Sequence, residues 1–354
     1  MSEELYYPPE SVSSKAHIAS MEQYREMYEH SIYSPDEFWA EQAERFCWFK
    51  RWDQVRSYNY DVTQADIQIE WFKGGQCNIT SNCLDRHLET RGGQTAILWE
   101  GNEPGENKSL TYRELHREVC KFANVLKSHG VKKGDRVSIY MPMVIELSIA
   151  MLACARIGAI HSIVFGGFSS TALADRIVDS SCTVVITTDG GFRGAKAIPI
   201  KANADEAMTL AEKQGVHVKT CVVVQRVGEK VPVLMKNGRD LWWHDEMSKA
   251  DPVCEPEVME SEDPLFILYT SGSTGKPKGV MHTTAGYMIY TALTHRYVFD
   301  YHQGDIWWCT ADIGWVTGHS YIVYGPLANG ATTVMFEGVP TYPDAGRFWD
   351  VVDR

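Results

Sequence analysis

Leu265-Phe-Ile-Leu-Tyr269 and the segment after it, Thr270-Ser-Gly-Ser-Thr-Gly-Lys-Pro-Lys-Gly279, are the most informative part of the sequence. The apolar residues at 265–269 predict a buried β-strand. Glycine and hydroxyl residues follow at the C-terminal end of that strand, which is where open α/β sheets bind their ligands. The two segments together therefore predict an α/β domain with a ligand-binding loop.

The composition of the loop suits a polyphosphate. Glycines free the backbone to approach a phosphate, hydroxyls donate to phosphate oxygens, and lysines neutralise charge. The glycines are Gly272, Gly275 and Gly279, the hydroxyl residues are Thr270, Ser271, Ser273 and Thr274, and the lysines are Lys276 and Lys278. The spacing is not that of a Walker A loop, and a short Gly/Ser run alone is most often a solvent loop.

Regular secondary structure is predicted on both sides of the loop. Thr111 and Glu114 have capping-box spacing, apolar residues follow at helical spacing, and Gly130 marks the helix end. Short β-rich runs then alternate with helical ones, at Arg136–Tyr140, Ile160–Phe165, Thr183–Thr188, Thr220–Gln225, Pro264–Thr270, Ile306–Thr310 and Ala331–Phe336. This alternation predicts βαβ units and a mainly parallel sheet.

The ends of the chain differ from this pattern. Residues before about Asn82 are rich in aromatic side chains, with a predicted helix after Pro35 and an extended segment near Ile67–Phe72, and are expected to form a capping layer. The last residues begin an amphipathic helix at Phe348 that no Gly or Pro terminates. We therefore expect the α/β domain to be truncated in this chain.

Composition excludes several classes of protein. With 44% apolar residues among 354, the chain can bury a large core, so a disordered protein is excluded. A net charge of −12 argues against a nucleic-acid or membrane-surface partner. The nine cysteines show no CxxC spacing, so neither a zinc site nor a disulfide framework is predicted. The N-terminus lacks a signal or transit peptide, and the apolar stretch Met141–Ile160 is interrupted by polar residues, so we expect a cytoplasmic protein.

The string Tyr269–Val280, YTSGSTGKPKGV, resembles the signature of the adenylate-forming superfamily, which includes acyl-CoA synthetases, luciferases and peptide adenylation domains. Within it, further segments resemble the branch of AMP-forming acetyl-CoA synthetases. These segments are Ser20–Tyr24, Asn82–His87, Val164–Ser169, Trp307–His319 and Tyr324–Leu327. The resemblance implies an N-terminal extension at 1–82 and an incomplete AMP-binding domain at 83–354, with the small C-terminal domain absent.

The resemblance also implies a reaction. Acetate and ATP would give acetyl-adenylate and pyrophosphate, and the thiol of coenzyme A would then displace AMP. ATP, Mg²⁺ and coenzyme A are the implied cofactors, and only small molecules are expected as partners. By resemblance, Thr270 through Lys276 hold the β- and γ-phosphates, with Thr270 and Lys276 as the catalytic residues. Because the ribose-binding Asp, hinge and catalytic Lys of the family lie beyond Arg354, little or no ligase activity is expected from this chain alone.

Two further sets of site residues follow from the resemblance. The acetate pocket is assigned to Trp315, Val316 and Thr317. Coenzyme A contacts are assigned to Gly166, Gly167, Arg193, Gly194, Ala195, Lys196, Thr317 and Thr341. Thr341 departs from the Asn of many family members and reaches less far, whereas His282 and His319 are interpreted as structural or substrate-positioning residues. No protein ligands for a metal are assigned.

Two alternatives stay open. A ligase for propionate or another short acid is the first, because one methylene is worth only about 1–3 kcal/mol and one pocket wall can decide the preference. A non-catalytic nucleotide-binding fragment, which keeps the phosphate loop but does not turn over, is the second.

Overall fold

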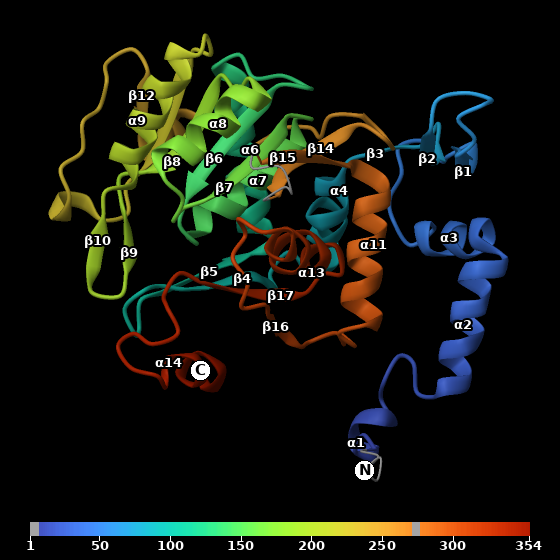
Figure 1. The fold of residues 1–354 in the computed structure, drawn as a ribbon. Coiled ribbons are helices and arrows are strands. Elements are labelled where there is room, and N and C mark those ends of the chain that lie inside the picture. Colours follow the sequence, from blue (N-terminus) through green and yellow to red (C-terminus); the bar gives the residue numbers. More distant parts are fainter. Residues whose placement is uncertain (1–6, 271–276) are drawn as a thin grey trace, which may run out of the picture.

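The computed structural model describes residues 7–270 and 277–354. At its centre lies a seven-stranded sheet of order β12-β11-β8-β6-β7-β14-β15 (Figure 1). Its strands are β12 (Asp240–Trp242), β11 (Thr220–Val224), β8 (Val184–Thr188), β6 (Arg136–Met141), β7 (Ile160–Phe165), β14 (Pro264–Thr270) and β15 (Lys278–Thr283). Neighbouring strands from β12 to β14 are parallel, and only β15 runs antiparallel. The predicted α/β class with a mainly parallel sheet is confirmed.

A second sheet has the order β16-β17-β4-β5, and three short strand pairs accompany it. Its strands are β16 (Ile306–Trp308), β17 (Thr332–Phe336), β4 (Thr95–Glu100) and β5 (Asn107–Thr111), of which β5 is antiparallel. The antiparallel pairs are β1 (Gln54–Asn59) with β2 (Gln68–Lys73), β9 (Gly191–Arg193) with β10 (Lys196–Ile198), and β3 (Gln76–Cys77) with β13 (Met259–Glu260).

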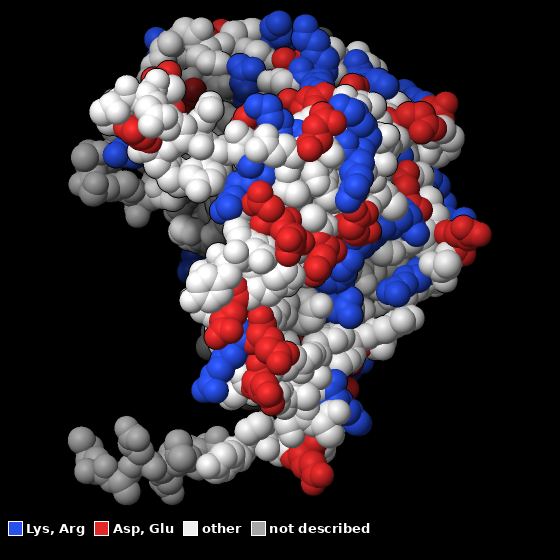
Figure 2. Space-filling model, turned by 90° about the vertical axis from the view of Figure 1, so that its right-hand side faces the viewer, with Lys and Arg blue, Asp and Glu red and all other residues white. Residues whose placement is uncertain are grey.

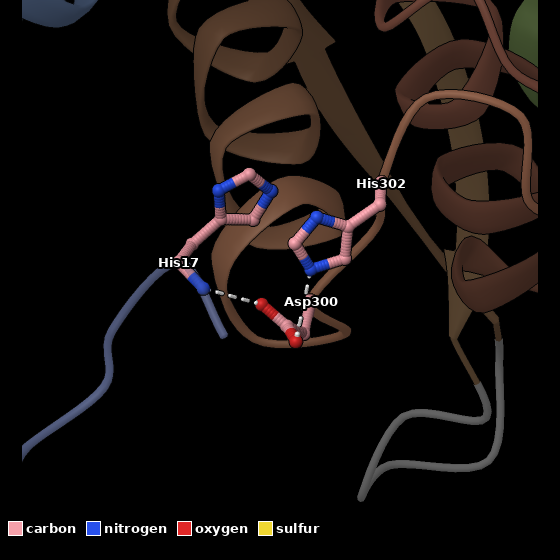
Figure 3. Close-up of side chains that lie close together, drawn as sticks. All are labelled: His17, Asp300 and His302. Atoms are coloured by element: carbon pink, nitrogen blue, oxygen red, sulfur yellow. Dashed lines mark hydrogen bonds and ion pairs between the residues drawn. The ribbon is translucent and has the colours of Figure 1, made fainter. Parts of the chain in front are cut away.

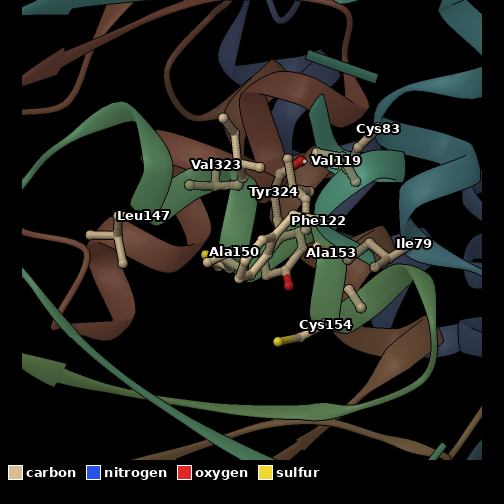
Figure 4. Close-up of a cluster of buried hydrophobic side chains, with 14 of the residues drawn as sticks. Ile79, Cys83, Val119, Phe122, Leu147, Ala150, Ala153, Cys154, Val323 and Tyr324 are labelled. Atoms are coloured by element: carbon tan, nitrogen blue, oxygen red, sulfur yellow. Dashed lines mark hydrogen bonds between the residues drawn. The ribbon is translucent and has the colours of Figure 1, made fainter. Parts of the chain in front are cut away.

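Helices cover both faces of the large sheet. One buried cluster joins alternate strand residues such as Tyr140 and Val185 to α8 (Ser170–Ser180) and α9 (Ile200–Lys213). The residues between them, such as Ile139 and Ile186, belong to a larger cluster with α6 (Tyr112–Ser128) and α7 (Ile145–Arg156). That cluster also includes Ile97 of β4 and Met335 of β17, so it extends to both sheets. Figure 4 shows side chains of α6 and α7 gathered around Tyr324 of η3. Alternate side chains of each parallel strand therefore point to opposite faces of the sheet and pack into two different cores.

The remaining helices are short apart from two. They are α1 (Glu10–Ser13), α2 (Met21–Tyr33), α3 (Pro35–Ala43), α4 (Ile79–Cys83), η1 (Asp85–His87), α5 (Leu88–Arg91), η2 (Gly228–Lys230), α10 (Trp243–Lys249), α11 (Thr284–Tyr297), α12 (Val316–Gly318), the π-helix η3 (His319–Tyr324), α13 (Gly325–Ala328) and α14 (Arg347–Asp353). Within the described part of the chain, no helix combines the length and the apolar character needed to cross a membrane.

Several predicted elements are confirmed. The strands β7 and β14 have the predicted bounds, and the helix after Pro35 is α3. The capping box of α6 is present, because Thr111 Oγ1 accepts from the Glu114 N–H at 3.2 Å and Glu114 Oε2 accepts from the Thr111 N–H at 2.8 Å. The stretch Met141–Ile160 contains the buried helix α7. Sequence patterns did not predict β15, which turns the segment after the Gly/Ser loop into the second half of a hairpin.

The N-terminal helices α1 to α3 form an arm beside the main body, drawn in blue in Figure 1. On the face shown in Figure 2, acidic and basic side chains are interspersed. The arm is followed by β1 and β2 and then by Asn78, which is fully buried. Asn78 Nδ2 donates to the carbonyls of Ala155 at 3.1 Å and Glu257 at 2.9 Å, and its Oδ1 accepts from the Thr80 N–H at 2.9 Å. One amide therefore joins the start of the main domain to α7 and to the segment before β13.

Asn78→Ala should lower the free energy of unfolding by about 3–5 kcal/mol, because several buried backbone groups would lose their partner at once. The control is Asn107→Ala, since Asn107 is exposed and donates only to the neighbouring carbonyl of Gly105 at 3.1 Å. Urea unfolding of both variants measures the difference. Equal losses for the two would show that the Asn78 amide does not hold these segments together.

Candidate active site

The two strands that flank the predicted loop lie at one edge of the large sheet. Strand β14 ends at Thr270, which is exposed and pairs with Lys278 of β15. Strand β7, parallel to β14, ends at Phe165 and is followed by Gly166 and Gly167. Because parallel strands end at the same edge, these segments are brought together. The predicted phosphate ligands Ser271, Gly272, Ser273, Thr274, Gly275 and Lys276 lie outside the described residues, so their contacts stay predictions.

A buried cation lies beside the loop end of the β14–β15 hairpin. The Arg176 guanidinium lies 5.3 Å from the Tyr269 ring and 5.0 Å from the Phe168 ring. The Tyr269 hydroxyl donates to Asp179 at 2.6 Å and so fixes the end of β14 against α8. Sequence analysis missed Arg176, although it follows the buried Leu173 by one helical turn and therefore lies on the inner face of α8.

Two cavities contain predicted site residues, and the smaller of them brings together part of the predicted coenzyme A set. It measures about 290 Å³, and its lining includes Gly166, Gly167, Arg193 and the segments 308–312 and 336–340. Arg193 is exposed at its rim. Asp312, which sequence analysis did not single out, also lines it, and burial raises the pKa of this carboxyl. A carboxyl with a raised pKa in a cavity is a typical feature of functional sites.

The other predicted coenzyme A residues lie around a tight turn. Gly194 and Ala195 connect β9 to β10, and Gly194 has φ +59°, which favours glycine. The Asn102 Nδ2 donates to the Gly194 carbonyl at 3.0 Å. A side chain at position 194 would meet the ring of Tyr342 at 3.4 Å, so the loop that carries Thr341 lies against this turn. Lys196 and Thr341 are both exposed.

The three predicted acetate-pocket residues point to different places. Trp315 is 50% exposed and lies 6.2 Å from Phe165, on the side of the smaller cavity. Val316 and Thr317 line a larger cavity of about 600 Å³, whose other walls come from α11 and the N-terminal segment. Thr317 therefore does not share a cavity with Arg193. The pocket assignment stays a prediction, as does the coenzyme A role of Thr317.

Three histidines pack around Phe266 of β14, at ring distances of 4.4 Å for His282, 4.7 Å for His319 and 5.3 Å for His161. His319 Nδ1 lies 3.1 Å from the Trp315 carbonyl, which can only accept, so this nitrogen carries the proton. Burial lowers the pKa of His319 to about 4 and also lowers the pKa of His161 and His282. All three are neutral near pH 7, which fits a structural role.

A buried ion network joins two segments of the smaller cavity. Arg226 donates to both oxygens of Glu337 at 2.6–3.0 Å and to both oxygens of Glu106 at 2.8 Å. Although burial opposes it, hydrogen bonding to the two carboxylates raises the pKa of Arg226. The guanidinium lies 4.7 Å from the ring of Phe192, next to the predicted ligand Arg193. Glu337 directly precedes the 338–341 segment, so Arg226 ties that segment to the β9–β10 hairpin.

In comparisons with known proteins, two family models match this chain, and together they cover all but its first 23 residues. The model described as AMP-binding enzyme matches residues 84–354, and the model described as acetyl-coenzyme A synthetase N-terminus matches residues 24–83. An acetyl-coenzyme A synthetase of Desulfatibacillum aliphaticivorans is 60% identical over 354 residues, covering 100% of this chain and 53% of the relative. One of Brucella anthropi is 58% identical, with 54% of the relative covered. The chain spans about half the length of the curated relatives it matches.

The neutral buried histidines predict a fold that is sensitive to acid. Burial lowers the pKa of His319 to about 4 and of His295 to about 3, against 6.5 for an ordinary histidine. Between pH 6.5 and 4 the unfolded chain therefore binds more protons than the folded one, and the free energy of unfolding falls as pH falls. Each group contributes up to about 1.4 kcal/mol per pH unit in this window. Urea unfolding across this range should show the slope, and His295→Gln should reduce it.

His116 provides the control of opposite sign, because its hydrogen bond to Asp85 raises its pKa to about 9. Its stabilising effect is complete below pH 6.5 and is lost as pH rises through 9. His116→Gln should flatten the alkaline side of the stability profile and leave the acid side unchanged. An acid slope that His295→Gln does not alter would contradict the assignment.

Glu337→Gln should lower the free energy of unfolding by about 3–5 kcal/mol, because it removes one partner of a buried ion pair. The side chain of Glu337 is fully buried, and that of Arg226 is 13% exposed. Glu212→Gln is the control, since Glu212 pairs with His217 at the surface and should change stability by less than about 0.5 kcal/mol. Thermal and urea unfolding measure both variants, and similar small effects would show that the network is not a structural anchor.

Proposed function

The chain belongs to the AMP-binding enzyme family, and we propose on this premise that its protein is an AMP-forming acetate–CoA ligase. One observation carries the proposal. The flanks of the predicted phosphate loop and the lining of the smaller cavity, including Gly166, Gly167 and Arg193, lie at the same edge of one parallel sheet. The names of the relatives, acetyl-coenzyme A synthetase, support acetate as the acid.

The proposed chemistry has two steps. A carboxylate oxygen of acetate attacks the α-phosphorus of ATP, and the bond to pyrophosphate breaks. The thiol of coenzyme A then loses its proton and attacks the acetyl carbonyl, and AMP leaves with the electron pair of the broken C–O bond. The first step is needed because a free carboxylate would have to expel oxide. The protein is therefore required to align reactants and stabilise charge, and no side-chain nucleophile is involved.

The described residues fit parts of this scheme. Thr270 is exposed at the end of β14, where its hydroxyl can meet a phosphate oxygen. Arg193 and Lys196 stand opposite each other at the exposed tip of the β9–β10 hairpin, which suits the phosphates of coenzyme A. Trp315 offers an exposed ring beside Phe165. Burial lowers the pKa of His282 and His319 and makes them weak bases, which agrees with a reaction that uses no strong side-chain base.

Mg²⁺ belongs to the proposal because pyrophosphate leaves with several negative charges. In proteins this ion is usually held by one or two carboxylates together with the substrate phosphates. Of the two carboxylates that line the smaller cavity, Glu337 is occupied by Arg226, whereas Asp312 accepts, among the described residues, only from the Gly314 N–H at 2.7 Å. Asp312 is therefore the described carboxylate that could assist a phosphate-bound Mg²⁺.

Two parts of the proposal concern organisation. We propose that residues 1–82 form an extension and residues 83–354 part of the AMP-binding domain, with small molecules as the partners and a cytoplasmic location. The alternatives are a ligase for propionate or another short acid, and a nucleotide-binding module without turnover. The rate with acetate compared with the rate with propionate decides between an acetate ligase and the first alternative. Turnover of any short acid rejects the second alternative.

Acetate-dependent exchange of labelled pyrophosphate into ATP tests the proposal without coenzyme A. We expect exchange with acetate preferred over propionate from a protein extended to the length of the relatives, and little or none from residues 1–354 alone. Lys276→Met should reduce exchange by about 10²-fold because it removes a charge that the family resemblance assigns to the phosphates. Lys213→Met is the matched control, since Lys213 is exposed on α9.

Each result bears on one part of the proposal. Faster exchange with propionate would replace acetate by the longer acid. No exchange with any short acid would reject the ligase and leave the binding module. Robust acetyl-CoA formation by residues 1–354 would contradict the expectation that this chain is inactive alone.

A further inference from the structure

Three side chains meet where the N-terminal arm touches the main body. His17, which precedes α2, lies against Asp300 and His302 in the turn after α11 (Figure 3). The His17 backbone N–H donates to Asp300 Oδ1 at 2.8 Å, and His302 Nε2 lies 3.2 Å from Asp300 Oδ2. Two contacting segments 283 residues apart in sequence thus bring two imidazoles and one carboxylate together.

We propose that His17, Asp300 and His302 bind a divalent transition-metal ion such as Zn²⁺, which fastens the N-terminal arm to the end of α11. Imidazole nitrogen with carboxylate oxygen is a donor set that zinc prefers. Zinc bonds of about 2.0–2.2 Å at a tetrahedral angle place two ligand atoms roughly 3.3–3.5 Å apart. The 3.2 Å between His302 Nε2 and Asp300 Oδ2 is close to that spacing.

The surrounding contacts leave suitable ligand atoms available. Asp300 Oδ1 is used by the His17 N–H, which leaves Oδ2 facing His302. His302 Nε2 is buried, and its partner among the described residues is Asp300 Oδ2 at 3.2 Å. The His302 backbone N–H donates to Asp305 at 2.9 Å and fixes the turn. Asp300 has φ +51°, a backbone conformation that Asp tolerates better than most residues.

Metal binding requires one movement. The rings of His17 and His302 stack at 4.4 Å, and His17 Nε2 donates to the Tyr301 carbonyl at 2.8 Å. One ligand atom from each of the three residues already lies within 4.8 Å of the others. A turn of the His17 ring about its Cβ–Cγ bond, with loss of the bond to Tyr301, would close the triangle. Water or the Tyr301 carbonyl can supply the fourth ligand.

The site is independent of the proposed ligase chemistry. It lies at the C-terminal end of α11, whereas the loop after β14 precedes the N-terminal end of this 14-residue helix. None of its three residues lines either of the two cavities that contain predicted site residues. The effect expected of the metal is local, because it would fix the part of the N-terminal arm around His17.

Titration of Zn²⁺ in competition with a chromophoric chelator tests the site in the whole chain. We expect His17→Gln and His302→Gln each to bind one zinc ion fewer than the parent protein. His217→Gln is the matched control, because His217 also lies beside a carboxylate, Glu212, at 3.3 Å, but without a third ligand. The chain has 12 histidines and nine cysteines, so only the difference between variants reports on this site.

Asp300→Asn separates loss of metal from loss of fold. An amide oxygen still accepts from the His17 N–H and Asn tolerates the same backbone conformation, but a neutral amide is a poorer zinc ligand. This variant should keep its thermal unfolding temperature in chelator and lose the increase that Zn²⁺ gives the parent. Limited proteolysis near residues 14–20 should slow with Zn²⁺ in the parent only. Equal zinc stoichiometry and equal proteolysis in the parent and all three site variants would overturn the proposal.

Discussion

Aromatic packing around Phe266 is the interaction on which the candidate active site depends. This ring in β14 contacts His161 of β7, His282 of β15 and His319 of η3. Gly166 directly follows β7, Lys278 is the first residue of β15, and Trp315 lies four residues before His319. Because the rings are buried, their nitrogens must stay neutral or find partners, and His161 does so by bonding to the Tyr324 hydroxyl at 2.7 Å. A cationic histidine in this stack would be a buried charge without a counter-charge in the stack, and it would weaken the packing between β7, β14 and β15.

Around the smaller cavity, by contrast, several side chains are charged, and the buried charges are paired whereas the exposed ones are not in that network. Arg226 is compensated by Glu106 and Glu337, whereas Arg193 at the rim of the cavity and Lys196 opposite it on the β9–β10 hairpin face solvent. A compensated cation positions the backbone but does not attract an anion over distance. The exposed cations keep their full charge and remain available to phosphate. This division explains how a chain of net charge −12 can offer a local anion-binding rim.

Local sequence patterns were sufficient for most of the fold and for part of the site. The capping box of α6 and the apolar runs of β7 and β14 depend on neighbouring residues, so their positions could be predicted. Arg226 and Glu337 could not be paired in advance, because 111 residues separate them and they follow strands of two different sheets, which only the tertiary packing brings together. The hairpin β14–β15 was also missed, since the apolar residues of β15 are exposed and show no clear alternation. Phosphate ligands at 271–276 were assigned by resemblance, not from local periodicity.

The larger cavity shows why the N-terminal segment cannot be treated as a separate layer. Its walls include Trp39 and Trp71 from that segment, facing Tyr287 of α11 and Val316 of α12. Trp39 and Trp71 pack edge to face at 5.9 Å, and Glu262 accepts from the Trp71 N–H at 2.5 Å. The N-terminal segment therefore shares a cavity wall with α11 and with the start of α12, which directly follows Trp315. The residues before Asn82 help to shape the environment of a predicted acetate-pocket residue, although no part of the proposed chemistry is assigned to them.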